Sequence, residues 1–178
     1  ASLLPISIVS FYSIPKDMLD RIYIIPSSLC KTLFPIISSK NSSENNEIVF
    51  LLLSSIKIIS FIVGFLLIII IFFSNIFISS WINYDFSIAS VPVIYSLSFG
   101  VLASSLNLIP FTFFQGLGMP EVTTKQQLVR FPIIILAAFF LISEYGLLGA
   151  GISWSFGRIL ALFMNLWYIY KKLKLQLS

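Results

Sequence analysis

The amino-acid sequence predicts an all-α fold, a polytopic transmembrane helical bundle that forms a single domain over residues 1–178. The first observation is composition, because 58% of the residues are hydrophobic and only 10% are charged. Soluble domains carry roughly 25% charged residues, so a water-soluble enzyme, a disordered tail and a nucleic-acid-binding module are excluded. The second observation is that five stretches are each long and apolar enough to cross a bilayer, which takes about 20 residues.

The N-terminal part is predicted to contain a helix stub and then the first full helix. Residues 1–12 are interpreted as the end of a helix that begins outside the chain, so the bundle is expected to be truncated at its N-terminus. Ser13 and Pro15 indicate a new helix start, with Asp17 in its first turn, where a negative charge is favourable. The five full helices are expected at 15–39, 48–73, 87–114, 123–142 and 147–170.

Polar, aromatic and turn-forming residues separate these helices. The polar run at 40–47 follows the first helix, and Trp81 and Tyr84, which suit a membrane interface, follow the second. Two glycines and a proline within 115–126 indicate a loop after the third helix. The last helix ends in the lysine-rich stretch 171–174.

The distribution of basic residues predicts the orientation of the chain. If all five helices cross, most basic residues fall on one side, namely Lys31, Lys40, Lys57, Lys125, Arg130, Lys171, Lys172 and Lys174. The other side carries Asp85, Glu144 and a self-neutralising cluster at 16–21. The positive-inside rule therefore predicts a cytoplasmic C-terminus.

The first full helix has a polar half and an apolar half when its residues are placed at 100° intervals. The polar half includes Lys16, Asp17, Asp20, Arg21, Tyr23, Ser27, Ser28, Lys31 and Thr32, and the apolar half includes Met18, Leu19, Ile22, Ile25, Leu29 and Leu33. A lipid-exposed helix has no reason to keep this division, so the polar half is expected to face a water-filled cavity or a polar partner helix. The alternative is that Lys16 with Asp20, and Asp17 with Arg21, merely pair at the membrane surface.

Arg158 is the charge that the sequence places deepest in the membrane. At a rise of 1.5 Å per residue it lies about 17 Å into helix 147–170, near the middle of a bilayer core of about 30 Å. An unpaired charge at that depth costs at least about 2.5–3.5 kcal/mol, so Arg158 is expected to point into the bundle or a cavity. Gly151 and Asn165, seven residues to either side, share its face.

Two interpretations of Arg158 remain open from its position alone. The first is structural: the guanidinium pairs with a carboxylate on another helix, or with carbonyls freed by prolines. The second is functional: the guanidinium captures a phosphate or a carboxylate, which it binds in a bidentate way and at any relevant pH.

The helix at 87–114 carries a stripe of hydroxyl residues, Ser98, Ser105 and Thr112, with Gly100 and Ala103 nearby. Small and hydroxyl residues let helices approach closely, so this stripe indicates helix packing.

The sequence contains few side chains that are suited to catalysis or to metal binding. It has one cysteine, Cys30, and no histidine, which excludes a disulfide framework, a zinc site and a histidine base within the chain. No metal site, cofactor or catalytic residue is therefore predicted, and the chain is not expected to be an enzyme.

Three regions of the sequence resemble the C-terminal half of bacterial polysaccharide-unit flippases, which carry O-antigen or capsule repeat units and belong to the multidrug/oligosaccharidyl-lipid/polysaccharide exporter superfamily. The stretches are FYSIP at 11–15, LDRIYIIPSSL at 19–29 and LFPIIS at 33–38, then NLIPF at 107–111 and QGLGMPEVTTK at 115–125, and finally YGLLGAGISW at 145–154 with Arg158. The match spans nearly the whole chain, in order and in spacing.

The resemblance implies a carrier with two six-helix bundles around a central cationic cavity, of which this chain is most of the second bundle. Such a carrier moves an undecaprenyl-diphosphate-linked oligosaccharide from the cytoplasmic to the periplasmic leaflet of the inner membrane, for polysaccharide and lipopolysaccharide biosynthesis. It implies three partners: the lipid-linked oligosaccharide, membrane lipids and the missing N-terminal bundle. No nucleic acid and no cofactor are implied.

The resemblance also implies which residues bind the substrate. The role is carried over to Arg21, Arg158 and Lys125, and Asn165 joins them because it shares the face of Arg158.

The chain departs from the family pattern in two places. Relatives often have an acidic residue just before the proline of helix eleven, where this chain has Arg130-Phe131-Pro132. Many also have an acid soon after the last-helix arginine, where this chain has Ala161 and Leu162. Arg158 is therefore expected to lack a local partner, which favours a ligand or a charge elsewhere.

Three other functions are weighed against the flippase. An ion-coupled multidrug exporter of the same superfamily would use Asp17 and Asp20 as ion-coupling residues. A polysaccharide polymerase or ligase would display its catalytic groups in a large periplasmic loop, which this sequence lacks. A fragment without activity of its own would serve only as a packing scaffold.

Overall fold

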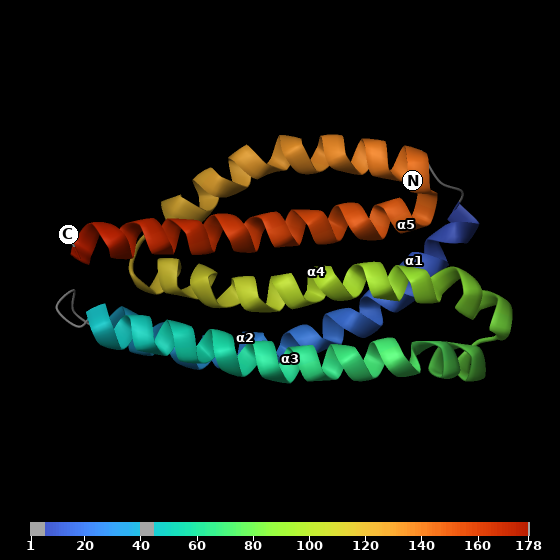
Figure 1. The fold of residues 1–178 in the computed structure, drawn as a ribbon, viewed down its shortest axis with the longest axis horizontal. Coiled ribbons are helices and arrows are strands. Elements are labelled where there is room, and N and C mark those ends of the chain that lie inside the picture. The colour runs from blue at the N-terminus through green and yellow to red at the C-terminus, as the bar shows by residue number, and fades with distance from the viewer. Residues whose placement is uncertain (1–5, 40–44, 178) are drawn as a thin grey trace.

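The structure is a computed structural model that describes residues 6–39 and 45–177 (Figure 1). Within these residues it is all-helical and has no strand, as predicted. Its elements are α1 (Ile6–Asp20), the short 3-10 helix η1 (Arg21–Tyr23), α2 (Ile24–Ser39), α3 (Asn45–Trp81), α4 (Tyr84–Gly116) and α5 (Pro120–Leu177). Residues 1–5 of the predicted stub, Lys40 and part of the predicted polar run at 40–47 lie outside the described residues.

The predicted helix start at Ser13 and Pro15 is wrong, because α1 begins at Ile6 and runs through both residues. A proline in a helix removes one backbone hydrogen bond, which is why the sequence suggested a boundary there. Pro15 is instead almost completely buried, and packing holds it inside a continuous helix. The described part of the predicted stub is therefore the beginning of α1 rather than a separate element.

The helix tightens further along, at η1. Pro26 lacks the N–H that would bond the carbonyl of Ile22 in a regular α-helix, so the backbone before it is free to rearrange. The N–H of Ile24 bonds the carbonyl of Arg21, three residues back, as in a 3-10 helix. Together α1, η1 and α2 form one membrane-capable span, Val9–Ser39.

α5 is bent into two arms at Gly146, whose φ of 55° and ψ of −124° are not helical. Figure 1 shows the two arms, orange and red, running side by side in opposite directions. The predicted helices at 123–142 and 147–170 fall in these two arms, which are two helices joined at the non-helical Gly146. The described residues contain four helices long and apolar enough to cross a membrane, so the predicted count of five full helices plus a stub is not matched.

Replacing Gly146 with alanine is expected to destabilise the protein by about 1–3 kcal/mol, because a side chain at this φ and ψ is strained. The melting midpoint of the purified protein in detergent measures the effect. Gly64→Ala in α3 is the matched control, since an added Cβ there meets no atom within 4 Å. Equal melting midpoints for the two variants would contradict the expectation.

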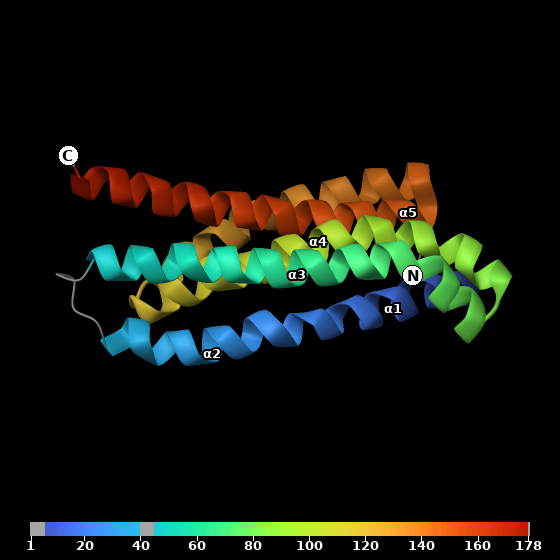
Figure 2. The same cartoon turned by 60° about the horizontal axis from the view of Figure 1, so that its bottom comes forward.

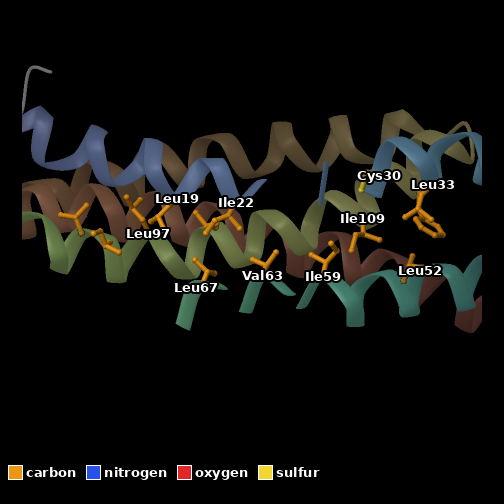
Figure 3. Packing of buried hydrophobic residues seen from close by; sticks show 14 of the residues in the cluster. Leu19, Ile22, Cys30, Leu33, Leu52, Ile59, Val63, Leu67, Leu97 and Ile109 are labelled. Carbon is orange, nitrogen blue, oxygen red and sulfur yellow. The ribbon is translucent and has the colours of Figure 1, made fainter. Parts of the chain in front are cut away.

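α4 is the central helix of the bundle and contacts α1, α2, α3 and α5 (Figures 1 and 2). The hydrophobic core lies where apolar side chains of α1, η1, α2 and α3 pack against α4. Figure 3 shows side chains of this core, among them Leu19, Ile22, Val63, Leu97 and Ile109. Leu19 and Ile22 belong to the apolar half predicted for the first helix, so that half packs against the bundle as expected.

A surface of α4 that consists of small residues packs against the second arm of α5. A Cβ added at Gly100 would meet the ring of Trp154, so only glycine allows this approach. The hydroxyl of Ser155 donates a hydrogen bond to the carbonyl of Ser96 at 2.6 Å. Ser98, Ser105 and Thr112 are buried, which agrees with the packing role predicted for their stripe.

The outer surface of the bundle is apolar. On α3, Phe61 and Phe72 are 77% and 81% exposed. Side chains of this kind fit the hydrocarbon of a bilayer rather than water. Figure 1 also places the C-terminus at the same end as the α4–α5 turn and the beginning of α3.

Candidate functional site

A polar groove lies between the α1–η1 segment, α4 and α5. It consists of two adjoining lobes, which share Tyr23, Ser104 and Arg158 in their linings. We call the first the tryptophan lobe, with a volume of about 330 Å³; Lys16, Asp20, Val101 and Trp154 complete its lining. We call the second the amide lobe, with a volume of about 230 Å³; its further polar lining consists of Asn107, Thr123, Gln126, Gln127, Arg130 and Asn165.

The tryptophan lobe is organised around one aromatic ring. The ammonium of Lys16 lies 4.7 Å from the ring centroid of Trp154, and the Cζ atom of Arg158 lies 5.0 Å from it. Both distances are within the range of cation–π attraction. Lys16 also forms an ion pair with Asp20, one helical turn further along α1. The ring of Trp154 therefore connects the charged face of α1 to Arg158 on α5.

Arg158 occupies the junction of the two lobes. Among residues 6–39 and 45–177 it forms no ion pair, since Asp20, the carboxylate in the same lobe, is paired with Lys16. The buried carboxylate pair that was one interpretation of Arg158 is thus not found in the described part of the chain. The guanidinium has no carboxylate partner there, and it is available to an anion that enters the groove.

The amide lobe is formed by residues of η1, α4 and both arms of α5. The Nδ2 atom of Asn165 donates to Oδ1 of Asn107 at 2.7 Å, and Nε2 of Gln126 donates to the carbonyl of Met164 at 3.3 Å. Two buried polar atoms of this lobe have no hydrogen-bond partner among the described residues, Oδ1 of Asn165 and Nε of Arg130. Two arginines line this lobe, and no aspartate or glutamate is among its described lining residues.

The structure places three of the six predicted site residues in the groove. Arg158 lines both lobes, Asn165 lines the amide lobe and Asp20 lines the tryptophan lobe.

The other three predicted residues line neither lobe. Asp17 and Arg21 are exposed, and Lys125 is paired with Glu121 at 3.5 Å on the surface. The binding roles of Arg21 and Lys125 were implied by the family resemblance, and the structure places neither side chain in the lining of the groove.

Sequence reasoning missed Arg130, Trp154 and Gln126 as groove residues. Arg130 was counted as a topology signal, and Trp154 was read as part of a sequence motif. Helical spacing carried a signal for each of them. Trp154 precedes Arg158 by four residues, and Gln126 precedes Arg130 by four, so each pair shares one helix face.

The chain is similar over most of its length to a protein from Shigella flexneri named "Putative O-antigen transporter". The two are 29% identical over 163 residues, which is 89% of this chain and 38% of that protein. The chain is also 29% identical over 89 residues to an uncharacterized membrane protein from Methanocaldococcus jannaschii, which is 50% of this chain and 18% of that protein. No family model and no solved structure matches.

The similarity to the Shigella flexneri protein confirms the resemblance to O-antigen flippases. The chain covers 38% of the length of that protein, which is consistent with the prediction that it is about half of such a protein. The chain spans less than two fifths of the length of either relative. With membrane proteins as relatives and four membrane-capable helices, the chain is a multi-pass membrane protein.

Proposed function

We propose that the protein to which this chain belongs moves a lipid-linked oligosaccharide across the bacterial inner membrane, from the cytoplasmic to the periplasmic leaflet. The observation that carries the proposal is Arg158, an exposed guanidinium at the junction of the two lobes of the polar groove, without a carboxylate partner in the described chain. The similarity to a protein named as an O-antigen transporter supports this class of substrate.

The substrate of this proposal is an undecaprenyl-diphosphate-linked repeat unit used in polysaccharide biosynthesis. Its diphosphate lies against Arg158, and its sugars contact polar side chains such as Asn165. Arg21 and Lys125 lie outside the groove and act as further cations on the route of the anion. The step is transport by alternating access, with no covalent chemistry and no cofactor.

The physical problem that such a protein solves is the transfer of a charged, hydroxyl-rich head group through hydrocarbon. A unit charge 4 Å from an opposite charge gains about 4 kcal/mol at an effective dielectric constant of 20. Amide and hydroxyl groups replace the water that the sugars lose. The groove supplies both kinds of group next to each other.

Residues 1–178 form one transmembrane bundle of this transporter, and an N-terminal bundle outside this chain completes the cavity. The C-terminus lies in the cytoplasm. Support for this orientation comes from the positive-inside rule, because the α4–α5 turn and the C-terminus share one end of the bundle and Lys125 and Lys171 stand near them in the sequence.

An ion-coupled multidrug exporter is the second candidate, favoured by the carboxylate of Asp20 in the tryptophan lobe. Asp17 and Asp20 are the ion-coupling residues in that case. The ion pair between Asp20 and Lys16 counts against it, because a coupling cation must compete with an ammonium that is already in place.

Deleting the full-length gene is expected to abolish surface polysaccharide and to leave lipid-linked repeat units on the cytoplasmic side of the membrane. Polysaccharide blots and protection of the lipid-linked units from externally added glycosidase measure the two effects. Normal polysaccharide with increased drug sensitivity would instead identify the exporter. Single repeat units that reach the periplasm but are not polymerised would identify a polymerase, and a normal strain would refute the proposal.

A further inference from the structure

We propose that Arg130 and Arg158 together hold one oxyanion in the amide lobe, and that Asn165 accepts a hydrogen bond from a hydroxyl of the same ligand. The ligand class is a group of monosaccharide size with a phosphate or a carboxylate beside a hydroxyl. The inference deepens the proposed function and depends on it only for the identity of the molecule that carries this group.

The charges of the amide lobe are the first support. Arg130 and Arg158 both line a cavity of about 230 Å³, and no carboxylate among the described lining residues balances them. Two like charges in a partly desolvated cavity repel each other, because the local dielectric constant is lower than that of water. An oxyanion between them turns the repulsion into two attractive contacts, each a charge-assisted hydrogen bond.

The two buried atoms without partners are the second support. The Nε atom of Arg130 is a buried donor without an acceptor in the part of the chain that the structure describes. A guanidinium binds an oxyanion in a bidentate way through two parallel N–H groups, and Nε–H is one of its five donors. The oxyanion is the acceptor that this nitrogen lacks.

Asn165 indicates that the ligand also carries a hydrogen-bond donor. It is 4% exposed and lines the amide lobe, and its Nδ2 atom is already used by Asn107. Its Oδ1 atom has no donor among residues 6–39 and 45–177. A buried acceptor without a partner costs free energy, and the hydroxyl of a sugar supplies the missing donor.

The volume of the lobe sets the size of the ligand. Sites for drug-sized molecules have volumes of roughly 300–1,000 Å³, so the 230 Å³ of the amide lobe takes one small group rather than an oligosaccharide. An anion and a hydroxyl that reach Arg130 and Asn165 in this space belong to the same or adjacent chemical units. Two sources provide such a group: the sugar phosphate at the lipid end of a repeat unit, and an acidic sugar within it.

The test uses the full-length protein in detergent, with every tryptophan except Trp154 replaced by phenylalanine. Trp154 contacts Arg158, so its fluorescence is expected to change when an anion binds there. The probes are glucose 1-phosphate, glucuronate, inorganic phosphate and the neutral methyl glucoside. Glucose 1-phosphate is expected to bind more tightly than inorganic phosphate, and methyl glucoside is expected to bind least.

Arg130→Gln is expected to weaken glucose 1-phosphate binding by about 10–100-fold, the range of a charge-assisted contact. Arg130→Lys keeps the charge and is expected to retain part of the affinity, so it reports on the site even if the glutamine variant gives little protein. Lys57→Gln removes an exposed cation of α3 outside the groove and is expected to change the affinity less than about twofold. Asn165→Ala is expected to weaken glucose 1-phosphate binding and to leave inorganic phosphate binding unchanged.

Each remaining outcome has a defined meaning. The proposal is overturned if no probe binds, if methyl glucoside binds as well as the anions, or if both Arg130 variants bind like the unsubstituted protein. Tighter binding of glucuronate than of glucose 1-phosphate identifies an acidic sugar as the source of the oxyanion. Arg130-dependent binding in a protein whose deletion leaves surface polysaccharide normal would refute the proposed function and leave the oxyanion site established.

Discussion

Replacing Arg158 with glutamine is expected to reduce surface polysaccharide at least tenfold while the full-length protein still inserts into the membrane. Arg158 is the cation shared by both lobes of the groove, so glutamine removes the charge that faces an anion from either side. A lost charge-assisted contact of about 1.5–3 kcal/mol corresponds to a factor of about 10–100 in binding. Polysaccharide blots of a deletion strain that carries the variant measure the effect.

Two variants control this experiment. Arg158→Lys keeps a positive charge but lacks the planar fork, so it is expected to restore polysaccharide only in part. Lys57→Gln removes a cation from the exposed surface of α3 and is expected to restore normal amounts. Membrane fractionation shows whether each variant is inserted to the same level. Normal polysaccharide from an inserted Arg158→Gln protein would remove Arg158 from the transport site.

Replacing Gly100 with valine, a change outside the groove lining, is expected to destabilise the protein by more than about 1 kcal/mol. Its added Cβ would meet the Trp154 ring and the hydroxyl of Ser155, on the arm of α5 that packs against α4. Overpacking of this kind costs about 1–3 kcal/mol, and valine adds two further methyl groups. At about 2–4 °C per kcal/mol for a domain of this size, the melting midpoint in detergent falls by several degrees.

Gly64→Ala is the matched control for this substitution as well. It also adds a side chain to a glycine in the interior of a long helix, but its Cβ enters open space. Alanine is the better helix former by about 0.8–1.0 kcal/mol, so this control is expected to melt at the same or a higher temperature. Equal melting of Gly100→Val and Gly64→Ala at one heating rate would show that α4 and α5 do not pack closely at Gly100.

The sequence alone determined the class of the protein and the approximate position of most of its helices. Apolar runs of about 20 residues and few charges leave a membrane bundle as the only compatible fold, because backbone polar groups must be satisfied within each segment. The same reasoning identified the apolar half of the first helix, which packs on the core, and Arg158, which lies in the groove. These conclusions depend on periodicity within one helix and on the cost of a buried charge, which are local properties.

Local signals were ambiguous where proline and glycine occur. A proline is compatible with a helix start and with a buried position inside a helix, and Pro15 takes the second role because it packs in the core. A glycine is compatible with a loop of several residues and with a tight reversal between two helices, and Gly146 takes the second role between the predicted helices at 123–142 and 147–170. At Gly146 the close packing of the two arms of α5 accompanies the bend, since Gly149 lies against the backbone of Leu141.

Only the tertiary structure decided which polar residues share the groove. Asn107 and Asn165 are 58 residues apart in the chain and form a hydrogen bond across two helices. Arg130 lies on the other arm of α5 from Arg158, yet both line the amide lobe, whereas Arg21 lines neither lobe. A helix pattern predicts which side chains share a face, but the partner of that face depends on how several helices pack at once. The contents of a site between helices are therefore a property of the packing.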